Sequence, residues 1–155
     1  MRLSQKIIRN LTIQGFDCNT INFEKIEPWL RFNPAICLAV VSISLIFSSP
    51  VIFFTLAAVN SIGAFSRHAA GDIIYNYIIR RFTETPPLPP NPAPRRFACF
   101  IGMAWSAAIG LLFVFNYFFT AFILGIIFII VVIPMVFFHF CVASEIYQKI
   151  IGRYR

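Results

Sequence analysis

The stretch FACFIGMAWSAAIGLLFVFNYFFTAFILGIIFIIVVIPMVFFHFCVAS, residues 97–144, contains no lysine, arginine, aspartate or glutamate. A helix that crosses a membrane needs about 20 apolar residues, so this run is too long for one span and fits two. Its most polar interior point is Asn116-Tyr117, which divides it into Phe97–Phe115 and Phe118–Ser144. The stretch therefore predicts a transmembrane hairpin.

A second uncharged run lies upstream, from Phe32 to Ser66, and Pro50 interrupts it. Proline cannot continue a helix that begins before it, so this run divides into the spans Pro34–Phe47 and Val51–Ser66. With 59% hydrophobic and 12% charged residues, the chain has too little polar surface for a soluble globule of its size. The predicted fold class is an all-α membrane protein, with four transmembrane helices in two hairpins and short interfacial amphipathic helices.

The positive charges predict the orientation in the membrane. Lysine and arginine occur before the first hairpin, between the hairpins and after the second, whereas both hairpin turns lack them. Because positive loops stay in the cytoplasm, we expect a multi-pass protein with both termini cytoplasmic. The net charge of +7 favours anionic lipid head groups over nucleic acid. The predicted head-group residues are Arg80, Arg81, Arg95 and Arg96.

Five segments follow from this pattern. They are a cytoplasmic N-terminal segment (1–33), a first hairpin (34–66), a cytoplasmic segment (67–96), a second hairpin (97–144) and a basic tail (145–155). Apolar residues at helical spacing predict a short surface helix in each of the first two cytoplasmic segments, and they include Leu3, Ile7, Ile8, Leu11, Ala70, Ile74 and Ile78. The proline-rich stretch 86–94 predicts an extended spacer between the hairpins.

Small residues in the third predicted helix indicate close helix packing. Gly102, Ser106 and Gly110 recur at a spacing of four, and Ala104 and Ala108 do the same on the next strip. Such patterns let another helix backbone approach closely. We expect them to pack within the bundle, with a homo-oligomer face as the alternative.

The sequence lacks the residues that most kinds of catalysis or transport require. None of the acidic residues lies inside a predicted span, although ion-coupled transport usually needs a carboxylate there. His68 and His139 are the only candidates for paired haem ligands, and we expect both at the interface in contact with water. The sequence has no phosphate loop, metal-ligand spacing or nucleophile triad, so neither a metal nor a cofactor is predicted.

The four cysteines fall on or near the predicted cytoplasmic side, where disulfides are rare. Cys99 follows Arg95 and Arg96 near a helix start, which favours its thiolate. Cys141 lies near a helix end with Glu145 one turn later, which disfavours its thiolate. The candidate thiols are Cys141, Cys99 and Cys18, and the alternative is that all the cysteines are ordinary small membrane residues.

Three short stretches form an ordered set of motifs: LRFNPAI (Leu30–Ile36), RRFACFIGMAWS (Arg95–Ser106) and FCVASEIY (Phe140–Tyr147). In this order they resemble the bacterial integral-membrane family called domain of unknown function 4395. The resemblance implies a location in the bacterial inner membrane. Relatives are often joined to thioredoxin-like or rhodanese-like modules, which implies thiol or sulfur handling. Cys141 matches the first cysteine of the family's last motif, whereas Ser144 replaces the second.

Three functions remain open from the sequence. The first is a structural or partner-binding membrane subunit without enzymatic activity. The second is a thiol- or sulfur-handling protein that uses Cys141 with Cys18 or Cys99 and a thioredoxin-like or rhodanese-like partner. The third is a facilitator for a small neutral solute, whose polar path could use only Ser42, Ser44, Asn60, Ser61, Ser106 and Asn116.

Overall fold

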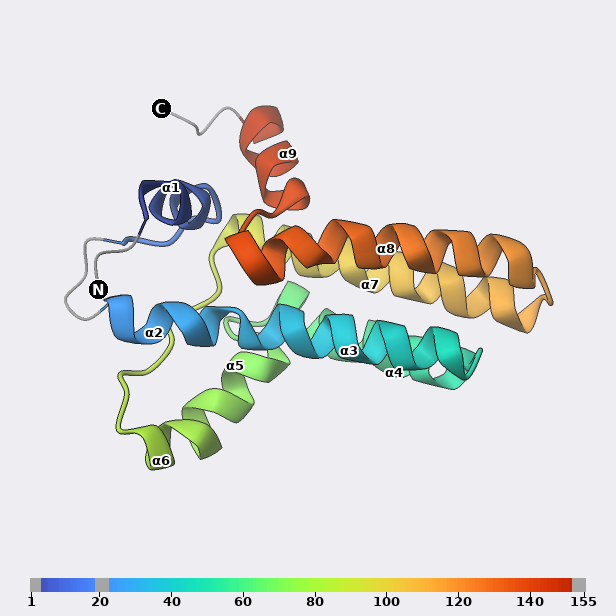
Figure 1. The fold of residues 1–155 in the computed structure, drawn as a ribbon, viewed down its shortest axis with the longest axis horizontal. Coiled ribbons are helices and arrows are strands. Elements are labelled where there is room, and N and C mark those ends of the chain that lie inside the picture. Colours follow the sequence, from blue (N-terminus) through green and yellow to red (C-terminus); the bar gives the residue numbers. More distant parts are fainter. Residues whose placement is uncertain (1–3, 19–22, 152–155) are drawn as a thin grey trace.

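The computed structural model describes residues 4–18 and 23–151, and this part of the chain is helical without any strand (Figure 1). Some residues of the predicted basic flanks and of the predicted N-terminal surface helix lie outside the described residues. They are Arg2, Leu3, Arg153 and Arg155. The elements are α1 (Gln5–Ile13), α2 (Phe23–Leu30), α3 (Phe32–Ile46), α4 (Pro50–Phe65), α5 (Ala70–Ile74), η1 (Tyr75–Ile79), α6 (Arg80–Thr83), α7 (Ala93–Val114), α8 (Phe118–Phe138) and α9 (Val142–Ile151).

The chain reverses direction at the two points where the sequence predicts turns. Pro50 occupies the first turn of α4, where its missing N–H costs nothing, and Ser48 just before it has a φ of 47°. Asn116, between α7 and α8, has a φ of 62°, a left-handed conformation that asparagine tolerates better than most residues. The helices α3, α4, α7 and α8 therefore lie side by side as antiparallel neighbours (Figure 1).

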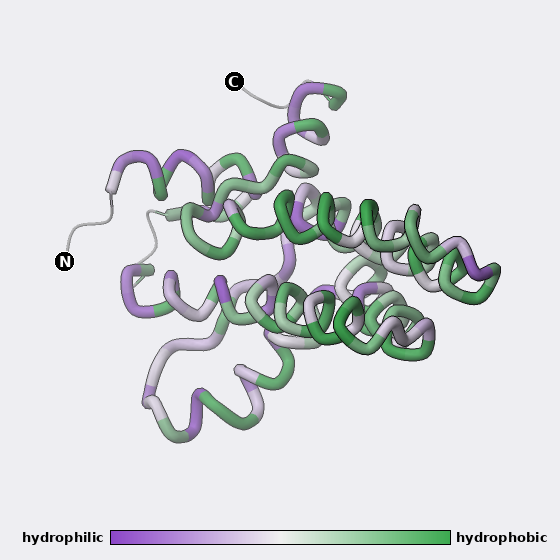
Figure 2. Tube along the Cα trace, turned by 45° about the vertical axis from the view of Figure 1, so that its right-hand side comes forward, coloured by the Kyte–Doolittle hydropathy of each residue, from purple (hydrophilic) through white to green (hydrophobic). Residues whose placement is uncertain are grey.

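In the described part of the chain, three helices are long and apolar enough to cross a membrane. They are the 24-residue segment Phe23–Ile46, the 22-residue α7 and the 21-residue α8. The fourth candidate is α4 together with α5–α6, a pair bent by 77°. Figure 2 shows hydrophobic residues along α7 and α8 and more hydrophilic ones toward α1 and α9. These helices thus support a multi-pass membrane protein, and the fourth span stays a prediction.

The core between the long helices is apolar and closely packed. It contains Val41, Leu45, Phe53, Leu56, Ile109, Phe113, Ala121 and Phe128. Gly102, Ser106 and Gly110 are buried on α7, which packs most extensively against α4. A Cβ atom at Gly110 would lie 3.1 Å from the Phe54 ring. Ala104 and Ala108 lie on the exposed face instead.

Two helix ends differ from the limits that the sequence predicts for the membrane spans. The helix α7 begins at Ala93 instead of Phe97, because Pro94 fits its first turn and so places Arg95 inside the helix. The helix α8 ends at Phe138 instead of Ser144. The backbone N–H groups of His139 and Phe140 both donate to the Pro134 carbonyl, and His139 has a φ of 53°. The chain then turns into α9, so most of the predicted tail is a packed helix (Figure 1).

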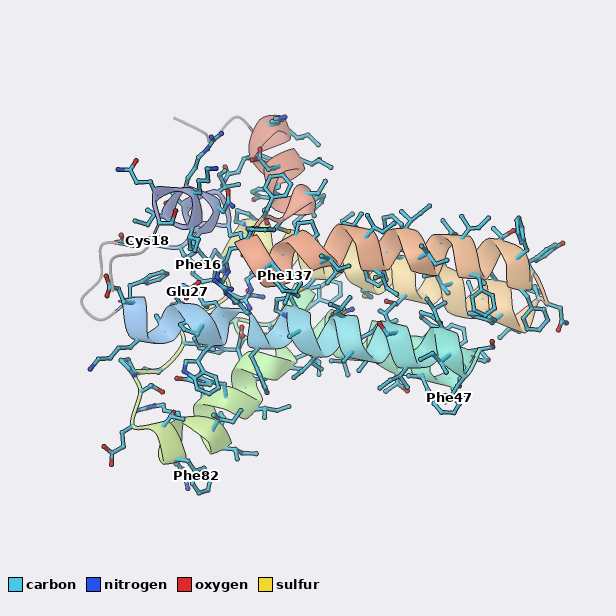
Figure 3. The ribbon with its side chains drawn as sticks, viewed as in Figure 1. Phe16, Cys18, Glu27, Phe47, Phe82 and Phe137 are labelled. Carbon is cyan, nitrogen blue, oxygen red and sulfur yellow. The ribbon has the colours of Figure 1, made fainter. Side chains whose placement is uncertain are left out.

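The remaining elements gather at one end of the long helices, which we call the polar end (Figure 1). The α5–η1–α6 segment corresponds to the surface helix predicted between the hairpins. Its residues Tyr77 and Phe82 are exposed. After α6 the chain runs without helix to Pro92, as the proline content predicts, although Leu88 and Asn91 on it are buried. Figure 3 shows Phe16, Glu27 and Phe82 toward the polar end and Phe47 at the opposite end.

Candidate functional site

A buried ion pair joins α5 to α7 at the polar end. The Arg95 guanidinium donates from Nη2 to Asp72 Oδ1 over 3.2 Å, and the two side chains are 2% and 0% exposed. The same Nη2 lies 3.4 Å from the Leu30 carbonyl, and the guanidinium stacks over the Phe16 ring at 5.4 Å. Arg95 was predicted to face lipid head groups with Arg80 and Arg81, but it lies inside the protein.

A second buried cluster connects α2 to the end of α8. Glu27 Oε1 lies 2.6 Å from His139 Nε2 and also accepts from Arg31 Nη2. Arg31 Nε lies 2.9 Å from the same His139 nitrogen. Because a ring nitrogen has a single hydrogen-bonding position, Nε2 either donates to Glu27 or accepts from Arg31. His139, expected in water contact, is only 2% exposed.

Burial lowers the pKa of His139 below its ordinary value of 6.5. The hydrogen bond and charge of Glu27 act in the opposite direction but do not offset the burial, and the Arg31 charge lowers the pKa further. The folded protein therefore favours the neutral imidazole at this corner.

Amides of α1 and α9 fasten these elements together. Asn10 Nδ2 donates to the Phe138 carbonyl over 2.8 Å, and Gln14 Nε2 donates to the His139 carbonyl over 2.6 Å. Gln148 on α9 donates to the Ile13 carbonyl over 3.0 Å. The helix α1 therefore packs on the protein through Leu11 and Ile13, which are buried. It is a fixed part of the polar end.

A small cavity of about 70 Å³ lies beside the Arg95–Asp72 pair, toward the apolar core. We call it the thiol cavity, because Cys37 of α3 and Cys99 of α7 both line it, with Asn60 of α4 and Arg95. Most of its remaining wall is apolar, including Phe128 and Val132 of α8. Cys37 and Cys99 are both free thiols and partly exposed.

Two polar groups at the thiol cavity have no partner in the protein. They are Asn60 Nδ2 and Arg95 Nη1, both buried N–H donors. Buried donors in folded proteins are nearly always paired with protein, water or a ligand. Their position beside Cys37 and Cys99 makes the thiol cavity the candidate functional site.

The sequence-predicted thiols separate into different surroundings. Cys99 lines the thiol cavity, whereas Cys141 is 6% exposed and lines an adjoining apolar cavity of about 80 Å³. Cys18 follows α1, where its thiol lies 3.9 Å from the Thr12 hydroxyl. Burial raises the pKa of Cys18 above its ordinary value. Ser144, which the sequence resemblance aligns with a cysteine, is buried and donates to the Pro94 carbonyl over 3.3 Å.

Sequence reasoning missed Cys37 as a site residue, as well as Asp72, Glu27 and Arg31. The sequence did contain a hint that Cys37 lies near Cys99, because the predicted topology places both residues at the same membrane face. Nothing in the local sequence around Asp72 or Arg95 indicates that they meet, since they lie on different helices.

The six polar residues proposed as a path for a neutral solute do not line one common cavity. Ser44 and Ser106 are buried, but each hydroxyl donates to a carbonyl of its own helix. Asn116 lies in the turn between α7 and α8, and only Asn60 of the six residues lines the thiol cavity. Among the described residues, no group of three or more His, Cys, Asp or Glu side chains could hold a metal ion.

The family model for the domain of unknown function DUF4395 matches residues 27–151. The chain belongs to the DUF4395 family. The matched region includes the two ionic clusters and the thiol cavity, so all of the candidate site lies within the DUF4395 domain. No curated protein and no solved structure matches the chain significantly.

Proposed function

We propose that this DUF4395 protein crosses the bacterial inner membrane four times, through α3, α4, α7 and α8, with both termini in the cytoplasm. The polar end then faces the cytoplasm and carries the basic residues Arg31, Arg80, Arg81, Arg96 and Lys149. The turns at the opposite end, around Ser48 and Asn116, contain no charged residue. This distribution is the one expected when positive segments remain in the cytoplasm.

We further propose that the protein is a membrane thiol carrier whose working pair is Cys37 and Cys99. The observation that carries this proposal is that two thiols from different helices line one cavity near the polar end. Cys141 matches the first cysteine of the family's last motif, but it lies in the neighbouring apolar cavity, and Ser144 stands at the position of the second cysteine. Cys37 therefore replaces Cys141 and Cys18 as the partner of Cys99.

The proposed reaction is thiol–disulfide exchange with the disulfide of a thioredoxin-like partner protein. The Cys99 thiolate attacks one partner sulfur, which forms a mixed disulfide and releases the other partner sulfur as a thiolate. The Cys37 thiolate then attacks Cys99, so that a Cys37–Cys99 disulfide forms and the partner leaves as a dithiol. Two electrons and two protons pass to the partner, and the reverse reaction restores the two thiols.

Trapping of the mixed disulfide tests this role. In cells that express Cys37→Ser, a Cys99-linked complex should accumulate, because the resolving thiol is absent. The complex should disappear in Cys99→Ser and in the double variant, and Cys141→Ser should behave like the unmodified protein. If Cys37→Ser traps nothing that Cys99→Ser does not also trap, the carrier role is wrong. A structural or partner-binding membrane subunit would then be the better description.

A further inference from the structure

The two unpartnered N–H groups at the thiol cavity need an acceptor. Arg95 is 2% exposed and Asn60 is 8% exposed, so neither donor reaches bulk water. Asp72 already uses Arg95 Nη2 through Oδ1 over 3.2 Å, which leaves Nη1 free. A buried N–H without an acceptor lowers the stability of the folded protein. Here two such groups lie beside the same cavity.

Size and wall chemistry limit what the cavity can hold. A buried water needs roughly 10–15 Å³ of such space, so a cavity of about 70 Å³ has room for an ion of one to three heavy atoms. The donors are few and much of the wall is apolar or contains sulfur, with Phe128, Met135 and the two thiols. A strongly hydrated ion would lose too many water contacts there.

We propose that the thiol cavity binds a small, weakly hydrated monovalent anion, held by Arg95 Nη1 and Asn60 Nδ2. Arg95 Nη1 supplies one N–H donor from α7, while Nη2 of the same guanidinium pairs with Asp72, and the Asn60 amide supplies a second donor from α4. Iodide and thiocyanate have this chemistry, as does hydrosulfide, whereas fluoride and sulfate do not. The anion site shares its wall with Cys37 and Cys99, but neither sulfur is a ligand of the anion.

Equilibrium dialysis of the detergent-purified full chain with labelled thiocyanate tests the proposal. We expect saturable binding at one site per chain, competition by iodide, and no competition by fluoride or sulfate at the same ionic strength. Asn60→Leu removes one donor and should weaken binding by about tenfold or more. This variant should fold, because it replaces an unpaired buried amide by an apolar group of similar size.

Three further variants make the result specific. Gly102→Ala should also weaken binding, since its new Cβ would lie 3.3 Å from Asn60 Nδ2. Ser61→Ala, next to Asn60 on the partly exposed face of α4, should bind like the unmodified chain. Cys18→Ser, which changes a thiol outside the cavity wall, should also bind thiocyanate like the unmodified chain. Binding that is unsaturable, or equal in Asn60→Leu and Ser61→Ala, would overturn the proposed site.

Discussion

Asp72 and Arg95 form an ion pair in which both side chains are almost fully buried, at 0% and 2% exposure and 3.2 Å apart. The pair connects the segment after α4 to the first turn of α7, and Arg95 also reaches the Leu30 carbonyl of α2. Three elements that are distant in sequence therefore meet at one guanidinium. The thiol cavity lies directly beside this junction, because Arg95 forms part of its wall.

Removal of either partner of this pair should destabilise the protein strongly. Arg95→Met leaves the Asp72 carboxylate buried without a counter-charge, which typically costs about 3–5 kcal/mol. Chemical denaturation in mild detergent measures the loss. Arg96→Met is the matched control, since Arg96 is less buried and donates only to the Ala64 and Phe65 carbonyls. The Asp72→Asn, Arg95→Met double variant should be less destabilised than the sum of the two single variants.

The stability of the protein should fall as the pH falls through about 6.5 and below. The pKa of His139 is lowered in the folded protein from 6.5 by burial, so the unfolded chain binds the proton more tightly. The contribution of neutral His139 is fully present above the unfolded pKa and is lost at lower pH. His139→Asn keeps a residue that tolerates the positive φ but cannot titrate. Its denaturation midpoint should depend less on pH in this range, and an unchanged pH dependence would contradict the burial of His139.

Gly63 on α4 makes room for the Cys99 thiol. A Cβ atom at position 63 would lie 2.8 Å from Cys99 Sγ and 3.3 Å from Cys99 Cβ. Gly63→Ala should therefore displace Cys99 and destabilise the protein by about 1–3 kcal/mol, as overpacking usually does. Combining it with Cys99→Ala should recover part of the loss, measured by thermal unfolding. If the two changes are simply additive, α4 and Cys99 do not pack as described.

The number of membrane spans determines whether the two termini lie on the same side of the membrane. Four spans place both termini in the cytoplasm, whereas three spans place them on opposite sides, with α4 and α5–α6 forming a re-entrant segment. A reporter active only in the cytoplasm, fused before Met1 or after Arg155, should be active in both positions. A periplasmic reporter inserted at Asn116 should also be active, because four spans place that turn outside.

The sequence predicted the long helices better than the site, and the reasons are physical. Pro50 and Asn116 divide the two uncharged runs through local backbone chemistry, so both turns could be predicted without any tertiary contact. The end of α8 could not, because the left-handed His139 is held by Glu27 and Arg31 from a distant helix. The meeting of Asp72 with Arg95 and of Cys37 with Cys99 likewise depends on packing between helices. The neighbouring charges suggested that Arg95 lies at the surface, because the sequence around it gives no sign of its buried partner Asp72.

Mapping of the disulfides formed by the purified protein tests the central claim, that Cys37 and Cys99 are a working pair. The chain would be oxidised in a glutathione redox buffer, its remaining thiols blocked, and its peptides identified by mass spectrometry. We predict a Cys37–Cys99 disulfide that forms reversibly, with Cys18 and Cys141 recovered as blocked thiols, and the same bond in the Cys141→Ser variant. A Cys99–Cys141 bond in its place, or four thiols that remain reduced at every potential, would contradict the claim.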